Sequence, residues 1–181
     1  MIILIAGLLL WTGAHFFKRA APGPRARLGD PGKGLVALAL VLSVVLMVLG
    51  YRAAPYIDVW YPPVWLKHLN NLLMLLAFAL FGNGAAKGTL SARIRHPQLT
   101  ALKIWAVAHL LVNGDLASIL LFGGLLAWAV AEVVVINRSQ AWDRPTDVSV
   151  KGDLKALAIG VVLYAVAAAI HIWAGVNPFG G

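Results

Sequence analysis

Residues 105–124 read WAVAHLLVNGDLASILLFGG. The stretch consists of two apolar runs joined at Asn113-Gly114-Asp115, three residue types that favour tight turns. Ionisable groups are costly in hydrocarbon, so a histidine inside such a run is a candidate functional residue. The stretch therefore predicts a membrane-embedded helical hairpin that carries His109 close to its turn.

The composition of the whole chain agrees with a membrane location. The 181 residues are 61% hydrophobic and 12% charged, whereas a soluble domain is close to half apolar and about a quarter charged. The chain has no cysteine, which excludes disulfides, iron–sulfur ligation and thiolate chemistry. The net charge of +8 does not indicate nucleic-acid binding, because the basic residues lie between apolar runs. We therefore expect an integral membrane protein whose main partner is the lipid bilayer.

The hydrophobic pattern predicts an all-α, polytopic bundle of about six transmembrane helices. We expect it to form a single transmembrane domain over residues 1–181. A helix needs about 20 apolar residues to cross the hydrocarbon core, so the fourth run, with 14, is tilted, incomplete or packed inside the bundle. The six runs are residues 2–17, 35–50, 64–82, 99–112, 116–136 and 154–176.

Basic residues predict the orientation of these helices, because cytoplasmic loops carry an excess of lysine and arginine. Segments 18–33, 87–103 and 137–155 carry five, four and four of the fifteen basic residues, and only Arg52 and Lys67 lie on the other side. We therefore predict three cytoplasmic loops, with both termini outside.

Four of the five histidines lie in four different apolar runs: His15, His68, His109 and His171. In the six-helix arrangement His109 lies roughly 18 Å along its helix from Pro97, at 1.5 Å per residue. That depth differs from the depth of His15 by only several ångströms, so the two side chains are candidates to hold one planar ligand. Trp11 and Trp105 precede these histidines by four residues and share their helix faces. They either wall a flat cofactor or serve as packing or lipid-facing side chains.

For the other polar residues in or beside the apolar runs, a structural role is an alternative to a functional one. His68 has Asn71 on its face and is a candidate for an inter-helix hydrogen bond. His171 is a candidate interfacial anchor, and His68 and His171 are the second choice of ligand pair. Asn113 follows His109 by four residues and either orients its ring or serves the turn. Asp115 is expected to cap the helix that follows it.

Three segments together resemble the NnrU family of bacterial membrane proteins. They are Arg95-His96-Pro97-Gln98, Trp105-Ala106-Val107-Ala108-His109 and Asn113-Gly114-Asp115-Leu116-Ala117-Ser118. The resemblance covers the whole chain and implies the bacterial cytoplasmic (inner) membrane. The family is associated with nitrite and nitric oxide reduction in denitrification.

This family is also similar to the plastid 15-cis-zeta-carotene isomerase, a haem b enzyme that acts on a carotenoid. The Arg-His-Pro-Gln tetrapeptide and the Trp-x-x-Ala-His pattern occur in both. By this resemblance His109 and His15 match the haem ligands, which implies haem b and a possible cis–trans isomerase activity. The isomerase has a cysteine three residues before the first of these histidines, where this chain has Ala106. The alanine at this position is compatible with haem binding, but it does not support the ligand exchange of the isomerase.

Two functions from different classes follow. The first is a haem-b-binding membrane protein with an isomerase-like or redox role and bis-histidine or switchable iron ligation, whose ligand would be a polyene or nitric oxide. The alternative is a non-enzymatic accessory protein for the assembly or maintenance of nitrite and nitric oxide reductases, in which the histidines join helices. The Arg-His-Pro tripeptide also resembles isoprenylcysteine-type methyltransferases. Their paired-glutamate motif has no counterpart here beyond Glu132.

Overall fold

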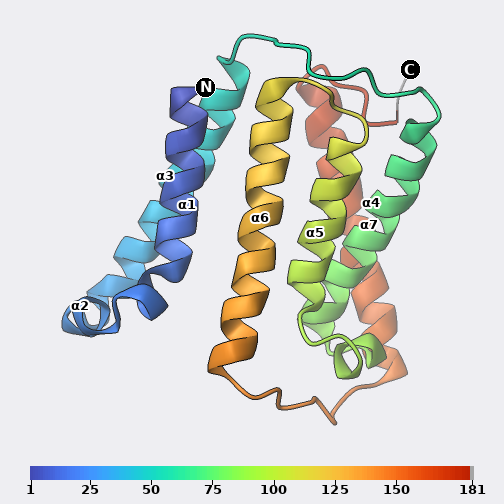
Figure 1. Ribbon diagram of the computed structural model, residues 1–181. Coiled ribbons are helices and arrows are strands. Elements are labelled where there is room, and N and C mark those ends of the chain that lie inside the picture. The colour runs from blue at the N-terminus through green and yellow to red at the C-terminus, as the bar shows by residue number, and fades with distance from the viewer. Residues whose placement is uncertain (180–181) are drawn as a thin grey trace. The chain divides into compact units, whose positions relative to one another are not determined.

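The computed structural model describes residues 1–179, whose regular structure is helical apart from an isolated bridge between Asp58 and Asp115. All six predicted apolar runs are confirmed as helices (Figure 1), and the short α2 and η1 are elements that the hydrophobic pattern does not predict. In chain order the elements are α1 (Ile2–Ala20), α2 (Pro22–Arg27), α3 (Pro31–Arg52), α4 (Leu66–Ala86), the 3-10 helix η1 (Thr89–Ala92), α5 (Pro97–Leu110), α6 (Leu116–Ser139) and α7 (Val150–Trp173).

Five helices, α1, α3, α4, α6 and α7, are long and apolar enough to cross a membrane. The chain is therefore a multi-pass membrane protein, as predicted. The helix of the fourth run, α5, has 14 residues. At 1.5 Å per residue it is about 21 Å long, too short for a hydrocarbon core of about 30 Å.

Proline, serine and aspartate mark where the helices begin. A proline occupies the first turn of α2, α3 and α5, where its missing N–H costs nothing. Ser149 caps α7 by accepting a hydrogen bond from Gly152 N at 3.1 Å. Asp115 caps α6 by accepting from Ser118 N at 2.9 Å, which confirms its predicted role.

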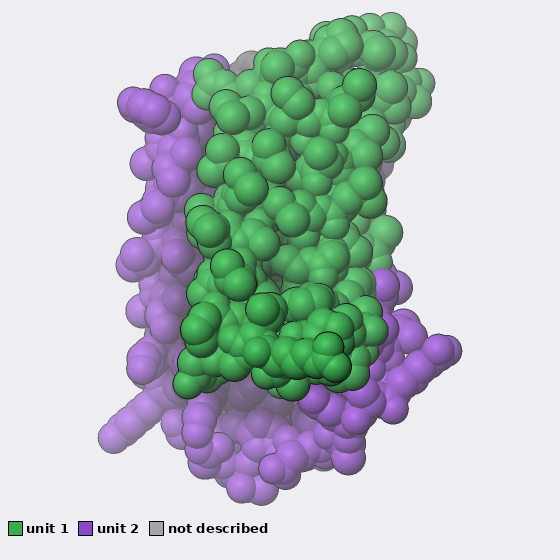
Figure 2. Space-filling model, turned by 90° about the vertical axis from the view of Figure 1, so that its left-hand side faces the viewer, with its two compact units in different colours: residues 1–61, 114–128 green, residues 62–113, 129–181 purple. Residues whose placement is uncertain are grey.

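The chain divides into two compact units, coloured green and purple in Figure 2. Unit 1 comprises residues 1–61 and 114–128, and unit 2 comprises residues 62–113 and the chain from Ala129 onward. Helix α6 contributes its first half to unit 1 and its second half to unit 2. The single transmembrane domain over residues 1–181 stays a prediction.

In unit 1, α1 packs against α3 through small residues. A Cβ on Gly7 would lie 2.9 Å from the Ser43 carbonyl oxygen, and one on Gly50 would overlap the backbone of Leu4. Small residues let membrane helices approach closely, because packing and not the hydrophobic effect drives their association. These glycines therefore hold α1 and α3 at short range.

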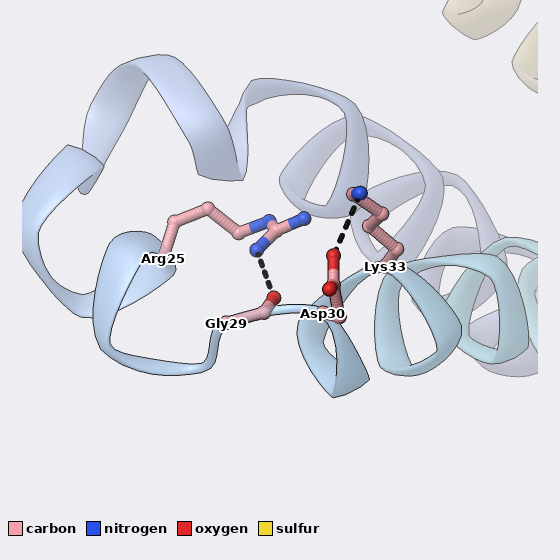
Figure 3. Close-up of polar contacts among 4 residues, drawn as sticks. All are labelled: Arg25, Gly29, Asp30 and Lys33. Atoms are coloured by element: carbon pink, nitrogen blue, oxygen red, sulfur yellow. Dashed lines mark hydrogen bonds and ion pairs between the residues drawn. The ribbon is translucent and has the colours of Figure 1, made fainter.

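The connection between α1 and α3 is a tight basic loop (Figure 3). The Arg25 Nη1 donates to the Gly29 carbonyl at 3.2 Å, and the Lys33 Nζ donates to Asp30 Oδ1 at 2.8 Å. Gly29 has a φ of +55°, a left-handed conformation that glycine adopts without steric cost. The short α2 thus lies within the basic segment 18–33, which is predicted to be cytoplasmic.

In unit 2, α4 packs against both α5 and α7. The contact with α7 is again made by small residues: a Cβ on Gly82 would overlap the Ala156 carbonyl oxygen, and one on Gly160 would lie 2.8 Å from the Phe78 carbonyl oxygen. Helix α7 also exposes apolar side chains such as Val161 at 59% and Ile170 at 56%. Such surfaces suit contact with lipid, in which every backbone polar group must be satisfied inside the helix.

Candidate functional site

The last turns of α1 place Trp11 and His15 on one helix face. The His15 Nδ1 lies 2.9 Å from the Trp11 carbonyl oxygen, and the two ring centroids are 4.3 Å apart. A carbonyl oxygen only accepts, so Nδ1 carries the proton and donates it. The lone pair of the neutral His15 ring therefore lies on Nε2.

A third ring joins this pair from α6. Trp128 lies 4.4 Å from His15 and 5.1 Å from Trp11, in an edge-to-face arrangement of 79° with Trp11. One turn earlier on α6, a Cβ on Gly124 would lie 3.0 Å from a methyl group of Leu8. The missing side chain at Gly124 therefore lets α6 approach α1, and Trp128 follows. We call Trp11, His15 and Trp128 the indole cluster.

Sequence reasoning missed Trp128, because it lies far from His15 along the chain. The spacing of Gly124 and Trp128, one turn apart on one helix face, is the signal that would have suggested it. The indole Nε1 atoms of Trp11 and Trp128 are both buried and have no hydrogen-bond partner among the described residues. An indole N–H is a donor only, and leaving a buried donor unsatisfied costs about 1–3 kcal/mol.

The end of α5 repeats the local geometry in unit 2. The His109 Nδ1 lies 2.9 Å from the Trp105 carbonyl oxygen, and their ring centroids are 4.9 Å apart. Both tryptophan–histidine pairs have an interplanar angle of 46°. His109 therefore has the same tautomer as His15, with its lone pair on Nε2.

Asn113 serves the turn. Its Nδ2 donates to the backbone carbonyl of His109 at 2.8 Å, and the backbone N of Asn113 bonds to the same oxygen at 3.0 Å. The side chain thus adds a hydrogen bond to a carbonyl at the C-terminal end of α5 that backbone N–H groups also reach. Asn113 therefore bonds to the backbone of His109 in the turn, and not to the imidazole ring.

The second-choice ligand pair also lies in unit 2. The His171 Nδ1 bonds to the Ala167 carbonyl at 2.7 Å, so this ring too has its lone pair on Nε2. His68 is exposed at the start of α4, and the Asn71 amide donates instead to the Phe179 carbonyl at 3.5 Å.

In unit 1, a network of hydrogen bonds surrounds the start of α6. Ser118 Oγ donates to Asp115 Oδ2 at 2.5 Å and lies 2.9 Å from the Tyr51 hydroxyl. The backbone of Leu116 donates to the Ile57 carbonyl at 2.9 Å. Nearby, the negative charge of Asp58 raises the pKa of the Tyr56 hydroxyl. This network fixes the first turn of α6.

A model of the family described as NnrU protein matches residues 3–178. The chain belongs to the NnrU family. No curated protein and no solved structure matches it significantly. The resemblance drawn from the three sequence segments is thereby confirmed at the level of the family.

In this NnrU family member, the rings of His15 and His109 are each oriented by a backbone carbonyl. Metal-bound histidines generally donate the other ring N–H to a carbonyl or carboxylate, which fixes the tautomer and the ring orientation. His15 and His109 each make such a bond to a backbone carbonyl. Among residues 1–179, no three or more histidine, aspartate or glutamate side chains are grouped so that they could hold a metal ion. His15 belongs to unit 1 and His109 to unit 2, so their pairing stays a prediction.

Proposed function

We propose that this NnrU family member binds haem b in the membrane, with His15 and His109 as iron ligands. The observation that carries the proposal is the repeated turn in which Nδ1 donates to a backbone carbonyl, leaving Nε2 as the ligand atom. The neighbouring indoles of Trp11 and Trp105 supply flat apolar walls, at 4.3 and 4.9 Å from the imidazoles. Asn113 supports the His109 turn through its backbone.

Haem bound in this way would supply redox or ligand-binding chemistry at its iron. A pair of histidines favours electron transfer, whereas one open position favours binding of nitric oxide or activation of a polyene in an isomerase-like reaction. The family link to denitrification supports nitric oxide as the ligand, and the similarity to the carotene isomerase supports a polyene. Position 106, where the isomerase has its cysteine, is a fully buried alanine and supplies no thiol.

The test is an absorption spectrum of the purified protein in detergent, oxidised and reduced, with haem quantified by pyridine haemochrome. We expect about one haem per chain in the wild type. In His15→Ala and in His109→Ala we expect roughly a tenth of that content or less, because even residues that support ligands change metal affinity by about 10–100-fold. His68→Ala is the matched control and should keep its haem. Haem retained in both ligand variants and lost in His68→Ala or His171→Ala would move the ligands to the second pair.

An accessory role in assembling nitrite or nitric oxide reductases is the second candidate, and the family association alone favours it. In that reading the histidines join helices by hydrogen bonds, each contributing about 0.6 kcal/mol. The Nδ1 atoms of His15, His109 and His171 bond within their own helices, so in the accessory role the inter-helix bonds would be made by Nε2. A colourless protein that does not take up haemin and co-purifies with a reductase would establish the accessory role.

We also propose that the chain lies in the bacterial inner membrane with both termini outside. The distribution of basic residues supports this orientation. Because the chain has no cysteine, single cysteines report its topology without background. Asn177→Cys should react with an impermeant maleimide in intact cells, and Ala141→Cys should react only after lysis. The reverse pattern would invert the topology.

A further inference from the structure

The indole cluster of unit 1 contains two hydrogen-bond donors without acceptors among the described residues. They are the Nε1–H groups of Trp11 and Trp128, both buried. The whole Trp128 side chain is close to inaccessible, with 7% exposure. Buried polar groups are nearly always paired in native proteins, so two unpaired donors in one cluster of rings require an explanation.

The residues around the cluster do not supply the acceptor. The Trp11 carbonyl already accepts the proton of His15 Nδ1 at 2.9 Å, and neither indole donates to the imidazole. The hydroxyl of Thr12 donates to the Leu8 carbonyl at 2.8 Å. Within unit 1, the two indole N–H groups therefore have no acceptor.

We propose that the two indole N–H groups bind a carboxylate, and that this carboxylate is a propionate of the haem held by His15. The inference rests on the proposed function. A carboxylate is acceptor-only and has two oxygens, which matches two donors. Hydrogen bonds to a charged acceptor are also about twice as strong as those between neutral groups. Trp11 and Trp128 are thus positioning residues for the cofactor.

The charge at the C-terminal end of α1 favours an anion near His15. Lys18 follows His15 by three residues and lies in the last turn of the helix. A positive charge near a partly buried carboxylate offsets part of the cost of removing it from water. A fatty acid would present the same carboxylate chemistry, so the experiment must separate these two sources.

The experiment is a titration of the full-length apoprotein in detergent with haemin and with haemin dimethyl ester, whose propionates carry no charge. The variants are Trp11→Phe, Trp128→Phe and the double variant, which keep an aromatic ring and lose the N–H. Trp142→Phe, in the loop after α6, is the matched control. For each single variant we expect haemin affinity to fall about tenfold, which is equivalent to about 1.4 kcal/mol, because one hydrogen bond to a charged group is lost.

The ester should bind the wild type more weakly than haemin, and the double variant should no longer distinguish the two. If the variants bind haemin as the wild type does, or keep the full discrimination against the ester, the propionate assignment is wrong and haem binding stands. A wild type that takes up neither compound overturns both the assignment and the proposed function.

A measurement on the wild type alone covers the case in which a variant does not fold. In protein labelled with ¹⁵N-tryptophan, the indole N–H signals of Trp11 and Trp128 should move downfield on addition of haemin, and that of Trp142 should not. Oleate is the competing probe. If oleate moves the two signals and haemin does not, the acceptor is a lipid carboxylate and the haem assignment fails.

Discussion

The His15 turn, from Trp11 to His15, and the His109 turn, from Trp105 to His109, have the same local structure and different surroundings. In both, the histidine donates from Nδ1 to the carbonyl four residues earlier at 2.9 Å, and in both the indole tilts 46° to the imidazole. The His15 turn lies within a long helix and packs against Trp128 of a second helix. The His109 turn ends a 14-residue helix and is closed by Asn113.

The comparison shows that the helix backbone sets the tautomer of each histidine, whereas the surrounding helices set what the histidine can bind. The carbonyl four residues back is present in every helix, so a helical histidine can fix its own Nδ1 proton. The indole donors without acceptors belong to the tertiary structure around His15. We therefore expect changes in helix packing to alter the His15 turn and changes in helix termination to alter the His109 turn.

The largest effect should come from separating α6 from α1 with Gly124→Leu. A Cβ added at this position would lie 3.0 Å from a methyl group of Leu8, so the larger side chain must push the helices apart. We expect a loss of about 1–3 kcal/mol in the free energy of unfolding, as for other overpacked sites. The ¹⁵N signals of the His15 ring should move, and those of His109 should not. Unfolding by SDS and imidazole NMR measure the two effects.

Gly123→Leu is the matched control, because a Cβ on Gly123 meets no atom within 4 Å. Both variants exchange the same residue types in the same helix, so they share any change in helix propensity. Equal destabilisation by the two would mean that contact with Leu8 does not determine how α6 packs in unit 1.

A smaller effect should follow from shortening the side chain that closes the other turn. Asn113→Ala removes the hydrogen bond to the His109 carbonyl, which we expect to cost about 1 kcal/mol. Thr12→Val removes a hydroxyl bonded to a carbonyl inside a continuous helix, and we expect a change within about 0.5 kcal/mol. Hydrogen exchange at the last amides of α5 should quicken in the first variant. Unchanged exchange there would show that the turn does not depend on Asn113.

The sequence predicts those features that depend on neighbours within one helix. The six apolar runs, the cap at Asp115 and the two tryptophan–histidine faces all follow from spacings of a few residues, and all are confirmed. The short α2 was missed because its sequence has no apolar run to indicate a helix. Trp128 was missed because its place beside His15 depends on how α6 packs against α1, which no local pattern encodes.

The smallest effect concerns the ion pairs of the basic loops, one in each unit. Lys87 and Asp147 join the end of α4 to the segment before α7, whereas Lys33 and Asp30 are neighbours on one turn. The hydrogen bond from Lys87 and its positive charge lower the pKa of Asp147. A lowered pKa means that the pair stabilises the fold above the ordinary carboxyl pKa, and that this contribution is lost as the pH falls through the lowered value.

Asp147→Asn should therefore reduce stability slightly at pH 7 and should no longer differ from the wild type once the pH is below the lowered pKa. Asp30→Asn should change little at either pH, because an exposed pair between neighbours contributes close to nothing. SDS unfolding at neutral and acidic pH measures both variants. The Lys87–Asp147 pair connects segments that are distant along the chain, so its loss frees the segment before α7. The Asp30–Lys33 pair lies within a turn whose conformation Pro31 and Gly29 already define, so its loss changes little. A difference between Asp147→Asn and the wild type that persists unchanged in acid would assign the effect to the packing of that segment instead of its charge.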